Sequence, residues 1–238
     1  MKKIINKLIK PFNIKICRIK EQRSTMNESL RWLSENGFKI CTVLDVGASD
    51  GRWSADCMIF FTDANYVLFE PQPVHAEALE SFARSCKNSV VIIDKAVGGS
   101  EGHTFFNVKN PFGGSLTNKE DGFSIQVPVT TIDSAVAQLN FPGPYLLKLD
   151  THGFEKMIID GASSTLKFCE IIIVEVYNYK LNKDTLLFWE MCTYLDVLGF
   201  RPVDLIDVLH RKYDNSLWQM DIVFVKKDWT GFLHNQYV

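Results

Sequence analysis

The sequence has little excess charge of either sign, because its 26 Lys and Arg residues nearly balance its 28 Asp and Glu residues, for a formal charge of -2. This balance argues against a generally basic nucleic-acid-binding protein, and we expect no nucleic-acid partner. No apolar run approaches the roughly 20 residues needed to cross a bilayer, and no signal-peptide core is visible. The six cysteines show no C-x-x-C pair and no disulfide-scaffold spacing, which indicates reduced thiols. These absences predict a cytoplasmic protein.

The chain has ample material for a packed core, since 46% of its 238 residues are hydrophobic. Apolar runs typical of strands alternate with helical patterns, which indicates βαβ units. The expected strands are Val43–Val46, Tyr66–Phe69, Val90–Ile93, Tyr145–Leu149, Ile171–Val176, Phe200–Leu205 and Met220–Val225. The expected helices are Arg52–Phe61, Pro73–Cys86, Ile132–Leu139, Glu155–Asp160 and Asp184–Leu198, the last closed by Gly199. We predict an α/β domain with a mostly parallel seven-stranded sheet, helices on both faces and an antiparallel C-terminal hairpin.

The stretch Gly99–Pro128 breaks this alternation. Glycine-rich loops there separate short alternating segments such as His103–Val108 and Phe123–Val129. This pattern indicates antiparallel strands joined by loops.

The N-terminus is basic, and we assign residues 1–40 to a helical extension that precedes a domain over residues 41–238. Apolar residues recur at helical spacing in its first turns, so an amphipathic helix could lie on an anionic membrane surface. The alternative is a solvated helix that packs on the domain or on a second subunit. The basic residues are Lys2, Lys3, Lys7, Lys10, Lys15, Arg18, Lys20 and Arg23.

A glycine-rich turn follows the first expected strand, in the segment Thr42–Trp53. Its glycines are spaced G-x-x-x-G and lack the middle glycine of the G-x-G-x-x-G dinucleotide fingerprint. The carboxylate of Asp45 beside the turn suits a ligand that carries an amine or hydroxyls, and we predict S-adenosylmethionine. The predicted contacts of the turn are Asp45, Gly47, Ala48, Ser49 and Gly51. The alternative is a turn whose glycines serve only its tight geometry.

Acidic residues also close the next two expected strands. Glu70, followed by Pro71, comes about 20 residues after the glycines, where a carboxylate accepts hydrogen bonds from both ribose hydroxyls. After the third strand, Asp94, Lys95 and Ala96 could contact the adenine ring, although an ordinary strand-ending aspartate fits Asp94 equally well. We predict that all five residues bind the cofactor.

The fourth expected core strand ends in a dense group of ionisable residues: Lys148, Asp150, His152 and Glu155. A hydroxyl nucleophile benefits from losing its proton as it attacks, and an imidazole is the side chain that most often accepts such a proton, as His152 could. We predict that His152 is the general base and that Asp150 positions the substrate or orients the imidazole. Lys148 and Glu155 are predicted to contact the substrate. A residue at a helix N-terminus without a catalytic task is the alternative for His152.

Glu175 is a charge inside the apolar fifth strand, and an unpaired buried carboxylate is costly. It could line the substrate pocket, where we place it, or pair with Lys148. Together with Asp150 and His152 it could also hold a divalent metal, but no spacing rule favours this, and we predict no metal.

Taken in order, these motifs resemble the FkbM family of S-adenosylmethionine-dependent methyltransferases over roughly residues 41–180. The resemblance rests on Leu44-Asp-Val-Gly-Ala48, Phe69-Glu-Pro-Gln-Pro73, Val129-Thr-Thr-Ile-Asp133, Lys148-Leu-Asp-Thr-His-Gly-Phe-Glu155, Gly161-Ala162 and Glu175. It implies a Rossmann-like class I methyltransferase fold and O-methyl transfer to a hydroxyl of a saccharide or secondary metabolite. It also implies a ligand contact for Ser115. The chain departs from the family at His152, where Glu or Gln is usual, and at Ser49, where Asn is usual.

Two other classes of protein share parts of this pattern. A nicotinamide-dependent oxidoreductase would use the same strand order and Glu70, although the missing middle glycine argues against it. A non-catalytic module could keep the fold to bind an adenosine compound or a partner, although the charged cluster around Asp150 argues against that role.

Overall fold

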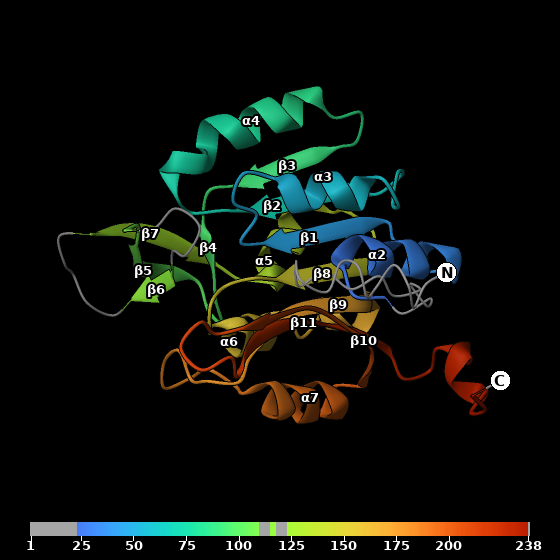
Figure 1. Ribbon diagram of the computed structural model, residues 1–238. Helices are drawn as coiled ribbons and strands as arrows, with labels where there is room; N and C mark the ends of the chain where they lie inside the picture. The colour runs from blue at the N-terminus through green and yellow to red at the C-terminus, as the bar shows by residue number, and fades with distance from the viewer. Residues whose placement is uncertain (1–22, 110–114, 118–122, 238) are drawn as a thin grey trace, which may run out of the picture.

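The computed structural model describes residues 23–109, 115–117 and 123–237, and its centre is a seven-stranded sheet (Figure 1). The strand order is β10-β11-β9-β8-β1-β2-β3. Strand β11 runs antiparallel to both of its neighbours, and the others run parallel to one another. The strands are β1 (Thr42–Val46), β2 (Asn65–Phe69), β3 (Val90–Ile93), β8 (Tyr145–Leu149), β9 (Cys169–Tyr177), β10 (Phe200–His210) and β11 (Leu217–Lys226). The predicted sheet and its C-terminal hairpin are confirmed.

The central strands are buried on both faces, which explains why their sequences are mostly apolar and not alternating, with Asp45 in β1 and Lys148 in β8 as charged exceptions. All residues of β1 and β8 are buried. Helices α2 (Met26–Glu35), α3 (Arg52–Met58) and α4 (Ala76–Ser85) share one core with one face of the sheet. Helices α5 (Ile132–Leu139), α6 (Glu155–Asp160) and α7 (Phe188–Val197) share a second core with the other face. The predicted covering of both faces is therefore confirmed.

A separate four-stranded sheet has the order β4-β7-β5-β6. Its strands are β4 (Ala96–Val97), β5 (Gly102–Asn107), β6 (Ser115–Thr117) and β7 (Ser124–Thr130). Strand β5 pairs antiparallel with β7, as predicted, and also with β6, whereas β4 pairs parallel with β7. In Figure 1 this sheet stands on the side toward which the arrowhead of β1 points. The sequence pattern predicted β5 and β7, but it predicted neither β4 and β6 as strands nor the separation of this sheet from the main one.

Three helices are shorter than predicted. Helix α3 ends at Met58 and not at Phe61, α4 begins at Ala76 after a 3-10 helix over Pro73–His75, and α7 begins at Phe188 and not at Asp184. Before α7, the side chain of Asn182 accepts hydrogen bonds from the amides of Asp184 and Thr185. Such local side-chain hydrogen bonds compete with helix formation, which delays the helix start. Gly199 follows the end of α7 with φ +89°, as its predicted capping position requires.

The described residues that precede β1 pack against the main sheet. Leu30 and Leu33 of α2 are fully buried, and Arg23 forms an ion pair with Asp204 of β10 at 2.5 Å. Residues 1–22, with the predicted amphipathic helix, lie outside the described residues. Within the described ranges, no helix is long and apolar enough to cross a membrane, and Cys41, Cys57, Cys86, Cys169 and Cys192 are free thiols.

Candidate functional site

A cleft lies at the carboxyl ends of the neighbouring strands β1 and β8. From β1 the chain continues to β2 on one side of the sheet, and β8 is followed by β9 on the other side. In open α/β sheets, ligands bind at such a switch point. The cleft encloses about 260 Å³, close to the lower end of the roughly 300–1,000 Å³ usual for small-molecule sites. Segments following β1, β2 and β8 line it, together with residues of the second sheet.

The turn after β1 needs glycine at its first position. Gly47 has φ +79°, and a Cβ there would lie 2.2 Å from the carbonyl oxygen of Asp150. The amides of Gly47 and Ala48 donate to the carbonyl of Phe69 at 3.0 and 3.1 Å. Ser49 also has a positive φ, of 51°. The backbone of this turn therefore lies directly against the backbone at Asp150, in the turn that follows β8.

Glu70 joins the first turn to the end of β2. One carboxylate oxygen accepts a hydrogen bond from the Ser49 amide and the other accepts one from the Gln72 amide, each at 2.9 Å. Burial raises the pKa of the Glu70 carboxyl, while these two amides oppose the rise. Each carboxylate oxygen keeps a lone pair for a further donor, so Glu70 can hold the turn and bind hydroxyls together.

Beneath the turn lies a buried ionic group centred on Lys148. Its ammonium lies 3.2 Å from Asp45 Oδ1 and 3.5 Å from Asp150 Oδ2, and it donates to the Gly47 carbonyl at 3.3 Å. Burial lowers the pKa of Lys148, but the charges of Asp45 and Asp150 outweigh this effect and raise it. Asp45 is fully buried and also accepts a hydrogen bond from Ser54 at 2.7 Å. This ion pair ties β1, β8 and both turns together.

The turn after β8 carries His152 in a left-handed conformation, with φ +58°. A positive φ is uncommon for residues other than glycine, and strained residues of this kind concentrate at functional sites. The buried carboxylate of Glu155 holds the turn, because it accepts hydrogen bonds from Thr151 and from the Gly153 amide. Burial raises the pKa of Glu155, against the effect of these donors. The Nδ1 atom of His152 lies 3.5 Å from Asp150 Oδ1.

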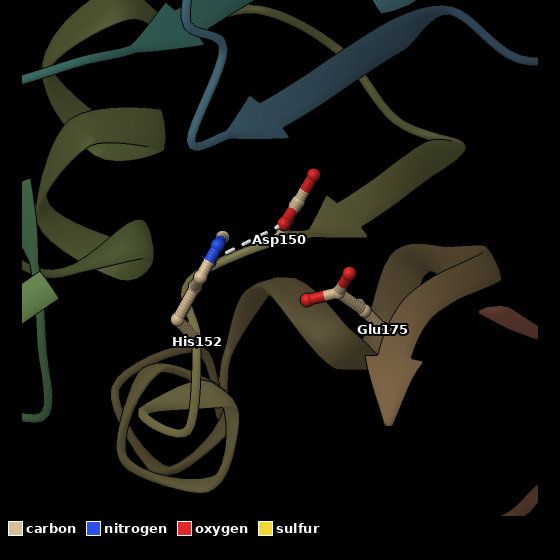
Figure 2. Close-up of side chains that lie close together, drawn as sticks. All are labelled: Asp150, His152 and Glu175. Carbon is tan, nitrogen blue, oxygen red and sulfur yellow. Dashed lines mark ion pairs between the residues drawn. The ribbon is translucent and has the colours of Figure 1, made fainter. Parts of the chain in front are cut away.

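Glu175 completes this group from the neighbouring strand β9. Figure 2 shows its carboxylate directed toward the space beside Asp150 and His152. One ligand atom from each of these three residues lies within 4.8 Å of the others. Tyr177 and Gln219 both donate hydrogen bonds to Glu175, which is buried. Burial, followed by the charge of Asp150, raises the pKa of the Glu175 carboxyl well above its ordinary value.

The structure brings most of the residues predicted from sequence into one cleft, but not all of them. Its lining includes Gly47, Ala48, Ser49, Glu70, Pro71, Lys95, Ala96, Lys148, Asp150 and His152. The lining does not include Asp45, Gly51, Asp94, Glu155 or Glu175. Ser115 lies in β6, where it pairs with Asn107, and its predicted ligand contact stays a prediction.

Several lining residues were not predicted from the sequence. Trp53 lies in the first turn of α3, and its ring lies 5.5 Å from the Lys148 ammonium. Its place directly after the glycine turn was a signal that could have found it. Phe106 reaches the cleft from β5. No local pattern distinguishes it from Phe105, because only the packing of the second sheet decides which of them faces the cleft.

Comparison with known sequences bears directly on this site. The family model of the methyltransferase FkbM domain matches residues 45–202. The hexuronic acid methyltransferase AglP of Haloferax volcanii is 26% identical over 164 residues, which cover 68% of this chain and 66% of that relative. The chain thus spans slightly less than two thirds of that relative's length.

Comparison with solved structures returns proteins of low identity. The fibrillarin pre-rRNA processing protein of Methanococcus jannaschii superposes with a TM-score of 0.49 at 12% identity, over 79% of this chain and 67% of that one. An rRNA methylase from Streptococcus thermophilus gives a TM-score of 0.47 at 10% identity, over 88% and 99% of the two chains. The family match, by contrast, covers more than half of the chain and includes Glu70 and both turns of the cleft. The chain therefore belongs to the FkbM family of methyltransferases, whose cofactor is S-adenosylmethionine.

Proposed function

We propose that this protein transfers a methyl group from S-adenosylmethionine to a hydroxyl oxygen of a saccharide or another small molecule. The observation that carries the proposal is that Asp150 and His152 line the same cleft as the Gly47–Ser49 turn. A relative that acts on a hexuronic acid supports a saccharide acceptor. Family membership supports methyl transfer over the oxidoreductase alternative. The non-catalytic alternative is separated from it by the activity assay below.

The cleft suits this cofactor on its own geometry. Its floor is backbone at Gly47, where a side chain would collide with the opposite turn. Trp53 Nε1, Asp150 Oδ1 and His152 Nδ1 are buried and have no hydrogen-bond partner within the described residues. Buried polar atoms without partners are costly, so a polar ligand at this cleft would offset that cost. We propose that Glu70 binds the ribose hydroxyls and that Lys95, Ala96 and Phe106 surround the adenine.

The remaining residues account for the transfer. When bound, S-adenosylmethionine supplies a methyl group on a positively charged sulfur. The acceptor oxygen forms the new bond to carbon as the carbon–sulfur bond breaks, and its hydroxyl proton must leave. We propose that His152 takes up this proton and that the Asp150 carboxylate, 3.5 Å from the imidazole, stabilises the positive charge that forms there. The Lys148 ammonium in turn holds Asp150 through its other oxygen.

We expect Glu70→Gln to weaken binding of S-adenosylhomocysteine by about 10- to 100-fold, because hydrogen bonds to a charged acceptor contribute about 1.5–3 kcal/mol. Isothermal titration calorimetry measures this change. The matched control is Glu77→Gln on the exposed face of α4, which we expect to bind like the native protein. Native affinity in Glu70→Gln would contradict the proposal that this carboxylate binds the ribose hydroxyls.

The acceptor class is tested with methyl-labelled S-adenosylmethionine and a panel of uronic acids, neutral sugars and amino sugars. We expect label to enter a hydroxyl-bearing sugar as an ether, which resists mild base, unlike a methyl ester. Label in an ester or on nitrogen would overturn O-methylation of a hydroxyl. A folded protein that binds the cofactor and labels no member of the panel would count against a saccharide acceptor.

The basic N-terminal segment provides a separate prediction about location. We propose that Met1–Arg23 brings the protein to an anionic membrane surface. Full-length protein should then sediment with anionic liposomes at low salt and be released as salt rises, because surface attraction is screened. A variant with Lys2, Lys3, Lys7 and Lys10 replaced by glutamine should stay in the supernatant. Native protein that never sediments with these liposomes would contradict the proposal.

A further inference from the structure

The three side chains drawn in Figure 2 come from separate positions of the sheet edge. Asp150 follows β8, His152 lies in the turn beyond it, and Glu175 lies in β9. Their ligand atoms are within 4.8 Å of one another, and Asp150 Oδ1 is 3.5 Å from His152 Nδ1. This separation is too long for a good hydrogen bond. It is the spacing expected for two atoms that bind one cation at about 2.0–2.2 Å each.

Two of these atoms lack any other partner. Asp150 Oδ1 and His152 Nδ1 are both buried from solvent, and neither has a hydrogen-bond partner among the described residues. The second oxygen of Asp150 faces the Lys148 ammonium, so that Oδ1 is left to face the imidazole.

The surroundings carry more negative than positive charge. Asp45, Asp150, Glu175 and Asp221 gather around Lys148, and Asp221 lies opposite Glu175 on β11. In the described part of the chain, neither Glu175 nor Asp221 forms an ion pair with a basic side chain. A further positive charge would relieve this excess.

We propose that Asp150, His152 and Glu175 bind one divalent cation through Asp150 Oδ1, His152 Nδ1 and a Glu175 oxygen. Mixed imidazole and carboxylate donors suit Mn²⁺ or Fe²⁺ better than Mg²⁺, which prefers oxygen alone. The hydrogen bonds from Tyr177 and Gln219 orient the Glu175 carboxylate, as partners of metal ligands commonly do. This site would replace our sequence-based prediction of no metal.

The cation site itself does not depend on the proposed function. Only the role of the cation in catalysis rests on that function. Acceptor oxygens would complete its coordination, and a hydroxyl bound to a cation releases its proton more readily. In the cation-bound protein His152 would be a ligand and not the general base. The cation, and not the imidazole, would then promote loss of the hydroxyl proton. The proton then leaves to solvent.

The test is a titration of chelator-treated, full-length protein with Mn²⁺. Binding is measured as the loss of the sharp electron paramagnetic resonance spectrum of free aqueous Mn²⁺. We expect the native chain and Glu77→Gln to bind one Mn²⁺ per chain. Because removing even an outer partner of a metal ligand costs roughly 10- to 100-fold in affinity, we expect Glu175→Gln and His152→Gln to lose at least that much. His152 is partly exposed, so its variant keeps the buried core intact if Glu175→Gln does not fold.

Calorimetry with S-adenosylhomocysteine on the same samples separates the two proposals. Native protein that binds S-adenosylhomocysteine but leaves Mn²⁺ free would overturn the cation site. Native-like Mn²⁺ binding by both Glu175→Gln and His152→Gln would also overturn it, because the cation would then lie elsewhere. One Mn²⁺ bound by a chain that fails to bind S-adenosylhomocysteine would support the cation site and contradict the proposed function.

Discussion

Gly47→Ala is expected to lower the free energy of unfolding by more than about 3 kcal/mol, at the upper end of single-substitution effects. Two costs combine at this position. The residue has φ +79°, where a side chain costs roughly 1–2 kcal/mol. The new Cβ would also lie 2.2 Å from the carbonyl oxygen of Asp150, which is backbone and cannot rotate away. The two turns must separate, so cofactor binding should be lost with stability. Urea denaturation and calorimetry with S-adenosylhomocysteine measure the two effects.

The chain offers a matched control for the backbone cost alone. Gly37 has φ +82°, but a Cβ there would meet no atom within 4 Å. Gly37→Ala should therefore lose only the roughly 1–2 kcal/mol of left-handed strain and should bind the cofactor normally. Equal losses in the free energy of unfolding for Gly37→Ala and Gly47→Ala would show that the close approach of the two turns does not contribute to the cost of the Gly47 substitution.

Asp150→Asn is expected to lower kcat by about 10²- to 10⁴-fold, the usual contribution of a positioned acid–base group. The amide keeps the size of the side chain but cannot hold an imidazolium or share a proton with His152. Lys148 keeps Asp45 as a charged partner, so the fold and the binding of S-adenosylhomocysteine should survive. Initial rates of methyl transfer and calorimetry separate the two effects. Asp63→Asn, an exposed aspartate before β2, is the control and should keep the native rate.

His152→Asn provides the complementary measurement. Asparagine tolerates the left-handed backbone that His152 adopts at φ +58°, so the turn should be retained while the imidazole is lost. We expect a fall in kcat without a loss of stability. Full activity in both Asp150→Asn and His152→Asn would contradict the roles assigned to the pair.

The sheet and its order along the chain were predictable because they depend on local patterns. Buried parallel strands are continuously apolar, and the turns between elements carry glycine and proline at fixed places. The same local signals located the Gly47 turn and Glu70. Resemblance over these motifs also predicted the family. The start of α7 could not be predicted in this way, because the Asn182 side chain captures the amides of the turn that precedes the helix.

The role of each carboxylate depended on its three-dimensional surroundings. The sequence places Asp45, Asp150, Glu155 and Glu175 all near strand ends. In the folded chain Asp45 is buried in an ion pair with Lys148, and Glu155 holds a turn, whereas Asp150 lines the cleft. A carboxylate has the same local sequence preference in each case, so only burial and the partners that the fold brings near it separate these roles.

Residue types and their spacing along the chain were therefore sufficient for the α/β fold, the position of the Gly47 turn and the methyltransferase family. Which side chains meet was decided by the pairing of β1 with β8 and of β8 with β9. The first of these pairings brings residues about 100 positions apart into contact, as with Lys148 and the Gly47 carbonyl. The meeting of Asp150, His152 and Glu175 follows from the second pairing. Contacts across parallel strands join distant segments through a crossover, and no local pattern encodes them.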